Sequence, residues 1–114
     1  MRELTRHLSE GEEYPRVATV DEPGEVNSVY LIETPATDPR KIPELTTLRF
    51  GTDGITNESL LAIVADRLRR AQRGAFGCDE NAAALARVTG ALVWLKAKKL
   101  KKENASTGQQ GRTN

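Results

Sequence analysis

In the first half of the chain, the pattern of apolar and polar residues predicts three short strands. Residues 16–20 alternate β-branched and polar residues, as a half-buried strand does, and residues 26–33 and 45–50 are interpreted as two further short strands. Between the first two stretches, Pro23 and Gly24 are typical of a tight turn. Residues 16–33 are therefore predicted to form a β-hairpin, and residues 45–50 a third strand.

A helical period replaces this alternation after residue 54. Either Thr56 or Asn57 can cap the first helix, because each side chain accepts a hydrogen bond from a free backbone N–H. Gly74 and Gly77 are expected to end it. The apolar face of this helix is predicted to consist of Leu60, Leu61, Val64, Leu68 and Ala71.

A second helix is predicted from about Asp79 to Glu103, beginning with acidic residues at the positive end of its dipole. Its apolar residues step by three, four and three positions, which is the spacing of a heptad seam. The seam consists of Leu85, Val88, Leu92 and Leu95. Alanines around it would let another helix approach closely, so the seam predicts at least a dimer.

These elements predict an α+β protein with a small N-terminal antiparallel β-sheet followed by a long helical hairpin that oligomerises. Residues 1–14 are a polar segment, expected to be loose or weakly helical. Residues 15–104 are expected to form a single domain, with the sheet in 15–53 and the hairpin in 54–104. Residues 105–114 are expected to be a disordered tail.

Composition supports association between subunits. Only 38% of the 114 residues are hydrophobic and 4% are aromatic, which leaves a thin core for a monomer. The net charge is +1, but residues 1–56 carry six basic and eleven acidic side chains, whereas residues 57–104 carry ten and five. Such an asymmetry suits head-to-tail subunit contacts or an anionic ligand, and it equally suits two solvated faces of opposite sign.

Several chemistries have little support in this composition. Cys78 and His7 are the only cysteine and histidine, so we expect no disulfide, no metal site and no histidine-based catalysis. No phosphate loop or catalytic constellation is present, and we expect a protein that is not an enzyme and needs no cofactor. The N-terminus lacks the apolar core of a signal peptide, and no apolar run approaches the ~20 residues of a membrane span. These features predict a soluble, intracellular protein.

Two polar clusters are the candidate ligand-binding residues. Phe76, Glu80 and Asn81 follow the glycine break, where the amide of Asn81 would suit a nucleobase edge or ribose hydroxyls. The same residues also suit a hydrophobic staple and a helix start. Lys98 and Lys102 lie four residues apart on one helix face and could clamp a diphosphate. They could equally stabilise the helix C-terminus and aid solubility.

Arginines on the first helix have a similar double interpretation. Arg73 lies near the break, and the cluster of Arg67, Arg69 and Arg70 precedes it with few acidic partners. Extended nucleic acid would attract such a cluster. However, the chain has few aromatic residues and no recognised nucleic-acid motif. Trp94 follows the seam and is expected to pack at a helical interface rather than to stack on a base.

The order and spacing of these motifs resemble phage proteins of the Thoeris anti-defence type, whose helical hairpin is similar to that of shorter anti-CBASS sponges. The resemblance covers about residues 17–102. Its matching residues are Asp21-Glu22-Pro23-Gly24, Tyr30, Ile32, Phe50, Gly54, Thr56-Asn57-Glu58, Leu60-Leu61-Ala62-Ile63, Asp66-Arg67-Leu68, Gly74, Phe76, Cys78, Glu80-Asn81, Leu85, Ala91-Leu92 and Trp94-Leu95.

The resemblance implies a non-catalytic sponge that sequesters cyclic ADP-ribose isomers made by TIR-domain proteins, or cyclic di- and trinucleotides, in the cytoplasm of the infected bacterium. It implies homodimers, often assembled into hexamers, with pockets between subunits. It assigns a polar contact to Asn81 and phosphate contacts to Lys98 and Lys102, where relatives commonly carry arginine. Relatives often carry an aromatic residue at the position of Ala71. Two alternatives remain: a nucleic-acid-binding phage regulator, and a structural phage protein without a ligand.

Overall fold

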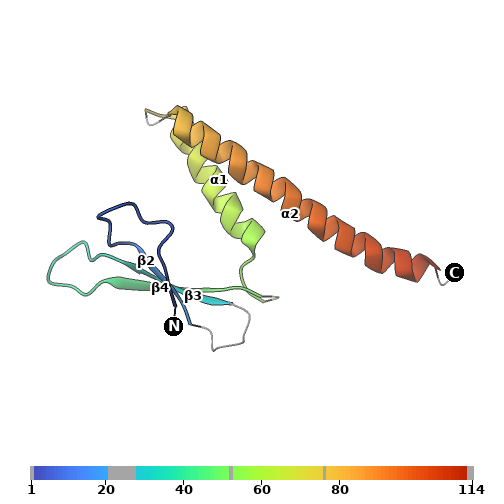
Figure 1. Cartoon of the computed structure of the whole chain (residues 1–114), viewed down its shortest axis with the longest axis horizontal. Helices are drawn as coiled ribbons and strands as arrows, with labels where there is room; N and C mark the ends of the chain where they lie inside the picture. Colours follow the sequence, from blue (N-terminus) through green and yellow to red (C-terminus); the bar gives the residue numbers. More distant parts are fainter. Residues whose placement is uncertain (1, 21–27, 52, 76, 113–114) are drawn as a thin grey trace. The chain divides into compact units, whose positions relative to one another are not determined.

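The computed structural model describes residues 2–20, 28–51, 53–75 and 77–112, with the side chains of the last helix described up to residue 105. Four strands are followed by two helices (Figure 1). The chain divides into two compact units, Met1–Ile55 and Thr56–Asn114. The boundary between the units lies two residues beyond the predicted end of the sheet region at residue 53.

The first unit is a four-stranded antiparallel sheet whose strands are neighbours in chain order. Its strands are β1 (Arg2–Leu4), β2 (Arg16–Thr19), β3 (Val29–Thr34) and β4 (Glu44–Arg49). Antiparallel pairing of β2 with β3 confirms the predicted hairpin, and β4 confirms the third strand. The predicted turn at Pro23 and Gly24 lies outside the described residues.

Strand β1 corrects the prediction that residues 1–14 are loose or weakly helical, and it extends the sheet region beyond residues 15–53. Its three residues pair with β2 from Arg2 opposite Thr19 to Leu4 opposite Val17. Two of the three are charged, so the alternation of apolar residues does not reveal the strand. The strand forms because backbone groups of β2 pair with it.

The register of the strands decides which side chains share a face of the sheet. The register places Val17 opposite Ile32, and Thr19 opposite Tyr30. The Tyr30 ring meets that of Phe50 edge to face, with centroids 5.6 Å apart. Thr19 is the buried polar residue of this unit among the described positions. The remaining strand residues are mostly half-buried or exposed, so the sheet has little enclosed core.

Helix α1 (Asn57–Arg73) begins and ends where the sequence predicts. Thr56 is the N-cap: its hydroxyl accepts a hydrogen bond from the Ser59 N–H at 3.0 Å, and Ser59 Oγ accepts one from the Thr56 N–H at 2.9 Å. Gly74 is the C-cap, and its N–H donates to the Ala71 carbonyl. The predicted choice between Thr56 and Asn57 is therefore decided in favour of Thr56.

Helix α2 (Asp79–Arg112) starts at the predicted residue but continues beyond the predicted end at Glu103. It thereby includes most of the stretch 105–114 that we expected to be disordered. Residues 98–105 are mainly lysine, leucine, glutamate and alanine, which are good helix formers, and no proline follows them. The helix therefore meets no local signal that would end it at Glu103.

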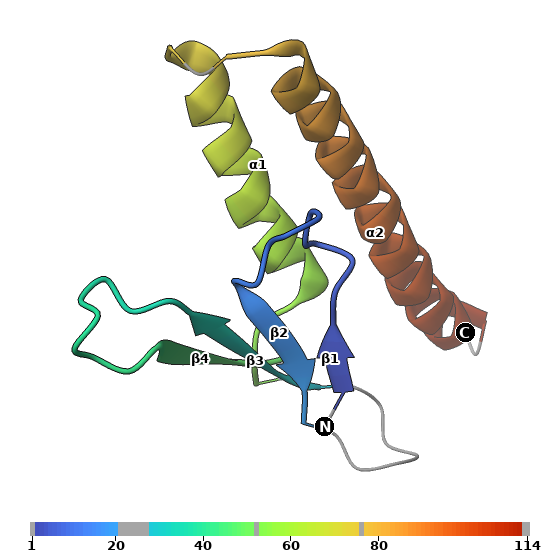
Figure 2. The same ribbon diagram turned by 60° about the vertical axis from the view of Figure 1, so that its left-hand side comes forward.

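The two helices pack side by side as an antiparallel hairpin (Figure 2). Half-buried or buried positions on α1 include Leu61, Ala65 and Leu68, with Ala65 fully buried. Val64 and Ile63 are 42% and 57% exposed, which corrects the predicted placement of Val64 on the packed face. The predicted seam of Leu85, Val88, Leu92 and Leu95 forms the half-buried stripe of α2. These four residues therefore contribute to the contact between α1 and α2 within the hairpin.

Candidate functional site

The closed end of the hairpin holds three of the predicted site residues. Arg73 is the last residue of α1, and Glu80 and Asn81 lie in the first turn of α2. Arg73 and Glu80 are exposed, whereas Asn81 is half-buried. The segment that joins the helices is short, so these side chains come from one end of the hairpin. Phe76, the fourth residue predicted there, lies outside the described residues.

Hydrogen bonds within the turn position the start of α2. Gln72 Oε1 accepts a bond from the Cys78 N–H at 2.8 Å, and the Asn81 N–H donates to Cys78 Sγ at 3.4 Å. A Cβ at Gly77 would lie 2.9 Å from the Gln72 carbonyl oxygen, so glycine permits this close approach. The Cys78 sulfur thus acts as the cap of α2. The sequence prediction assigned the cysteine no role.

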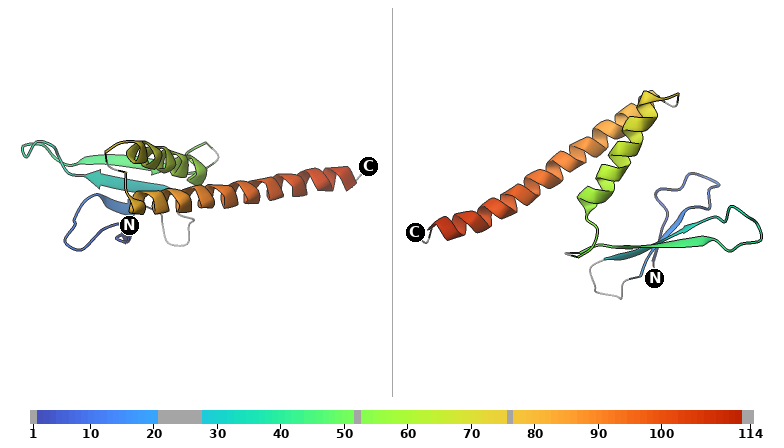
Figure 3. Two further views of the ribbon diagram at one scale, coloured as in Figure 1. Left: turned by 90° about the horizontal axis from the view of Figure 1, so that it is seen from above. Right: turned by 180° about the vertical axis from the view of Figure 1, so that it is seen from behind.

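Lys98 and Lys102 lie on a part of α2 that extends beyond α1. At about 1.5 Å per residue, the 17 residues of α1 span ~26 Å and the 34 residues of α2 span ~51 Å. Half-buried positions on α2 end at Leu95, and residues 96–105 are all exposed. Both views in Figure 3 show this extension. Both lysines therefore lie in the part of α2 that extends past α1, with exposed side chains.

One protomer keeps the two halves of the predicted site apart. Lys98 is 17 residues after Asn81 on the same helix, and Lys102 is 21 residues after it. Those spacings correspond to ~26 Å and ~32 Å along the axis. A lysine side chain reaches roughly 6 Å from its backbone, so neither lysine can share a small-molecule pocket with Asn81 of the same chain. The structure groups Arg73, Glu80 and Asn81, and separates them from Lys98 and Lys102.

The arginine cluster on α1 is exposed and has one described ion pair. Arg70 Nε lies 3.1 Å from Asp66 Oδ2, one helical turn away. Arg67 and Arg69 are exposed on the same helix. An exposed pair of this type contributes little to stability, typically 0–1 kcal/mol. The cluster therefore remains a positively charged surface near the turn.

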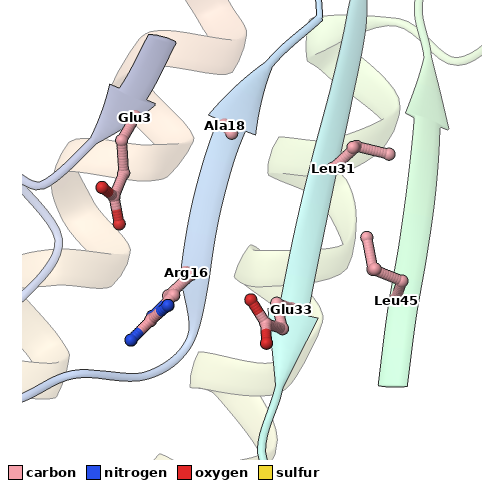
Figure 4. Close-up of a pocket in the computed structure, with 6 residues that line it drawn as sticks. All are labelled: Glu3, Arg16, Ala18, Leu31, Glu33 and Leu45. Atoms are coloured by element: carbon pink, nitrogen blue, oxygen red, sulfur yellow. The ribbon is translucent and has the colours of Figure 1, made fainter. Parts of the chain in front are cut away.

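The sheet offers a different hollow, of about 420 Å³, on the face opposite Tyr30 and Phe50 (Figure 4). Ala18, Leu31 and Leu45 form its apolar part, and Leu45 is 62% exposed. Arg16 lies among acidic side chains, with Glu33 opposite it on β3 and an ion pair to Glu13. The hydrogen bond to Glu13 is the main reason that the pKa of Arg16 is raised. Because this guanidinium is already paired, the hollow is a poor match for a phosphate.

The described part of the chain has neither a clustered metal-ligand set nor an apolar helix of membrane-spanning length. No group of three or more His, Cys, Asp or Glu side chains is placed there to hold a metal ion. Among the same residues, no helix combines the length and the apolar character of a membrane span.

Comparison with known proteins relates part of the chain to a phage protein. No protein-family model matches the chain. A segment of 53 residues is 40% identical to "Thoeris anti-defense 1" of Bacillus phage SBSphiJ7. Over this segment, the chain is related to a Thoeris anti-defence protein.

Over the aligned segment, the match confirms the resemblance inferred from the motifs. The aligned segment covers 46% of this chain and 37% of the phage protein. The chain thus corresponds to well under half of the relative's length. An identity of 40% over a segment of this size indicates common descent of the shared part. It does not assign the activity of the whole relative to this chain.

Proposed function

We propose that this protein counters a bacterial defence system on behalf of a phage by binding a cyclic nucleotide signal and holding it away from its effector. The observation that carries the proposal is the 40% identity to a Thoeris anti-defence protein over 53 residues. The exposed lysines on the α2 extension add a surface suited to phosphate groups.

The proposed ligands are cyclic ADP-ribose isomers or the cyclic oligonucleotides of CBASS systems. These molecules combine two or more phosphates with nucleobases and ribose hydroxyls. Lys98 and Lys102 would bind the phosphates, while Arg73, Glu80, Asn81 and Phe76 at the turn would bind polar and aromatic groups. Lysine provides a point charge and lacks the two-pronged geometry of arginine, so the preferred ligand is expected to differ from that of relatives with arginine.

The proposed site requires two subunits. Lys98 and Lys102 lie ~26–32 Å from Asn81 along one helix, so a small ligand can touch both groups only if a second copy supplies one of them. We therefore propose a homodimer, with hexamers as a further assembly. No cofactor is needed. The site of action would be the cytoplasm of the infected host, where the signal is made.

Calorimetric titration with a panel of cyclic ADP-ribose isomers, cyclic dinucleotides and cyclic trinucleotides tests the function. Saturable binding of one class, with about one ligand per interface, is the expected result. Binding of duplex DNA that falls steeply with salt, and no cyclic nucleotide binding, would favour a nucleic-acid-binding regulator. Absence of binding to both would favour a structural protein.

A further inference from the structure

A small residue at its centre creates the hollow on the sheet. The register places Ala18 between Glu3 on β1 and Leu31 on β3. Because the alanine side chain ends at its Cβ, the longer side chains around it stand higher and leave about 420 Å³ open (Figure 4). Leu45 from β4 borders the apolar side of the hollow and is 62% exposed. An exposed apolar patch with a polar rim is typical of a protein interaction site.

The polar rim of the hollow is mainly acidic. Glu3 and Glu33 lie on the strands to either side of Arg16, and Glu13 forms an ion pair with the same guanidinium. Three carboxylates thus accompany one positive charge. Residues 1–56 as a whole carry eleven acidic and six basic side chains, so the wider charge of this half has the same sign as the rim. The occupant that fits this hollow therefore combines an apolar side chain with positive charge.

The extension of α2 beyond α1 has both properties. Residues 96–105 include five lysines and one glutamate, and every side chain in this range is exposed. Leu100, which is 57% exposed, is the large apolar side chain of the range. At about 100° of rotation per residue, Lys96 lies on the same side of the helix, ~40° from Leu100 and one turn away. This side of the extension therefore matches the hollow in both polarity and charge.

We infer that Leu100 of one copy docks in the sheet hollow of a second copy. The leucine side chain lies over Ala18 and against Leu31, and the ammonium group of Lys96 beside it contacts the acidic rim. Every copy carries one hollow and one extension, so the contact needs no other protein. The excess of acidic side chains in residues 1–56 and of basic side chains in residues 57–104 favours this head-to-tail approach.

This contact goes beyond the proposed binding of a cyclic nucleotide and does not depend on it. Lys98 and Lys102 each lie two residues from Leu100, which places them ~160° from it around the helix. They therefore point away from the docked side and stay available for phosphate groups. One side of the extension serves docking, and the opposite side serves the proposed ligand.

Disulfide formation between two singly substituted proteins tests the contact without any ligand. In a Cys78→Ser background, one protein carries Ala18→Cys and the other carries Leu100→Cys, and the two are mixed under mild oxidation. A disulfide needs Cα atoms within roughly 7 Å of each other, so the mixed 18–100 product should form at least about tenfold faster than in a control mixture with Lys98→Cys in place of Leu100→Cys. Mass spectrometry separates the mixed product from either homodimer.

Two results of this experiment would overturn the inference. Equal rates for the partners with thiols at positions 98 and 100 would mean that random collisions form the product. A faster product with Ile63→Cys, at an exposed apolar position of α1 one turn before Arg67, would give the hollow a different occupant.

Filling the hollow provides a second test on a protein that keeps its own lysines. A carbodiimide joins an amine to a carboxylate in contact with it, so peptide mapping should find Lys96 coupled to Glu3 or Glu33. Ala18→Leu should reduce this coupling by about fivefold or more, because the larger side chain occupies the hollow. Thr47→Leu is the matched control: it lies on the same face of the sheet, outside the hollow, and should leave the coupling unchanged.

Isotope labelling shows which chain supplies the lysine. In an equal mixture of labelled and unlabelled protein, coupling between copies yields cross-linked peptides with one heavy and one light partner. Products whose two partners always carry the same label would place the contact within one chain and contradict docking between copies. Equal losses of coupling in Ala18→Leu and Thr47→Leu would also contradict it, since only the first substitution fills the hollow.

Discussion

Lys102 is the residue at which the proposed binding is most directly tested. Its ammonium group is exposed on the α2 extension, one helical turn after Lys98. A charge-assisted hydrogen bond to a phosphate contributes enough that Lys102→Ala should weaken binding of the cyclic nucleotide by roughly 10- to 100-fold. Calorimetric titration of the variant measures this change.

Lys96→Ala is the matched control for that substitution. Lys96 is also exposed on α2, but it lies on the other side of the helix from Lys98 and Lys102. Its removal should change the dissociation constant for the cyclic nucleotide by less than about threefold, because it alters only the general electrostatic field around the helix. Equal and modest losses for both variants would show that the lysines act as a diffuse positive surface.

At the scale of single elements, the start of α1 depends on one reciprocal pair of hydrogen bonds. Thr56→Ala removes the hydroxyl that accepts the Ser59 N–H, and it should lower the free energy of unfolding by about 1 kcal/mol. Thr56→Ser keeps the acceptor and should retain most of the stability. Urea unfolding followed by helical circular dichroism, at one protein concentration, compares the two. Equal losses would mean that the cap does not stabilise the helix.

The loop after β4 depends on a close approach that only glycine allows. The Ile55 N–H donates to the Arg49 carbonyl at 2.8 Å, and a Cβ on Gly54 would lie 2.3 Å from that oxygen. Gly54→Ala should therefore reduce stability by roughly 1–3 kcal/mol, as overpacking does.

Gly74→Ala is the control for this substitution. Its Cβ would have its nearest neighbours at 3.8 and 3.9 Å, which is ordinary contact, so the change should be small. Thermal unfolding of both variants measures the difference. A Gly54→Ala protein as stable as Gly74→Ala would contradict the role of the close approach.

For the whole molecule, the proposed function predicts that the bound signal is stored unchanged. Heating a complex of the protein and a cyclic nucleotide should unfold the protein and release the ligand with its original mass and chromatographic retention. Recovery of a linear or hydrolysed product would identify an enzyme instead. A sample of the ligand heated alone controls for thermal breakdown.

Because both units have little enclosed interior, we also predict that assembly contributes to stability. Among the described residues, Ala65 and Thr19 are the buried positions, and large apolar side chains such as Val93 and Trp94 are exposed. A second copy that covers such side chains would add to the free energy of unfolding through mass action. The midpoint of thermal unfolding should therefore rise with protein concentration.

Local signals in the sequence were sufficient for most of the elements. The alternation in residues 16–20 predicted a strand, and a cap at Thr56 or Asn57 together with Gly74 marked the two ends of α1. These signals operate within a few residues through side-chain periodicity, capping and backbone freedom, so they can be read without knowledge of distant partners. The resemblance to Thoeris anti-defence proteins was likewise carried by the order of motifs.

Tertiary structure decided which surfaces those elements use. Strand β1 forms because β2 offers it hydrogen bonds, and nothing in its three residues predicts that pairing. The heptad spacing of Leu85 to Leu95 specified a helical partner, but the hairpin made α1 that partner, and the direction of its approach left Val64 exposed. The same geometry separates Asn81 from Lys98 and Lys102 along a rigid helix. Spacing in sequence shows which residues share a helix face, whereas the packing of helices against each other decides what that face meets.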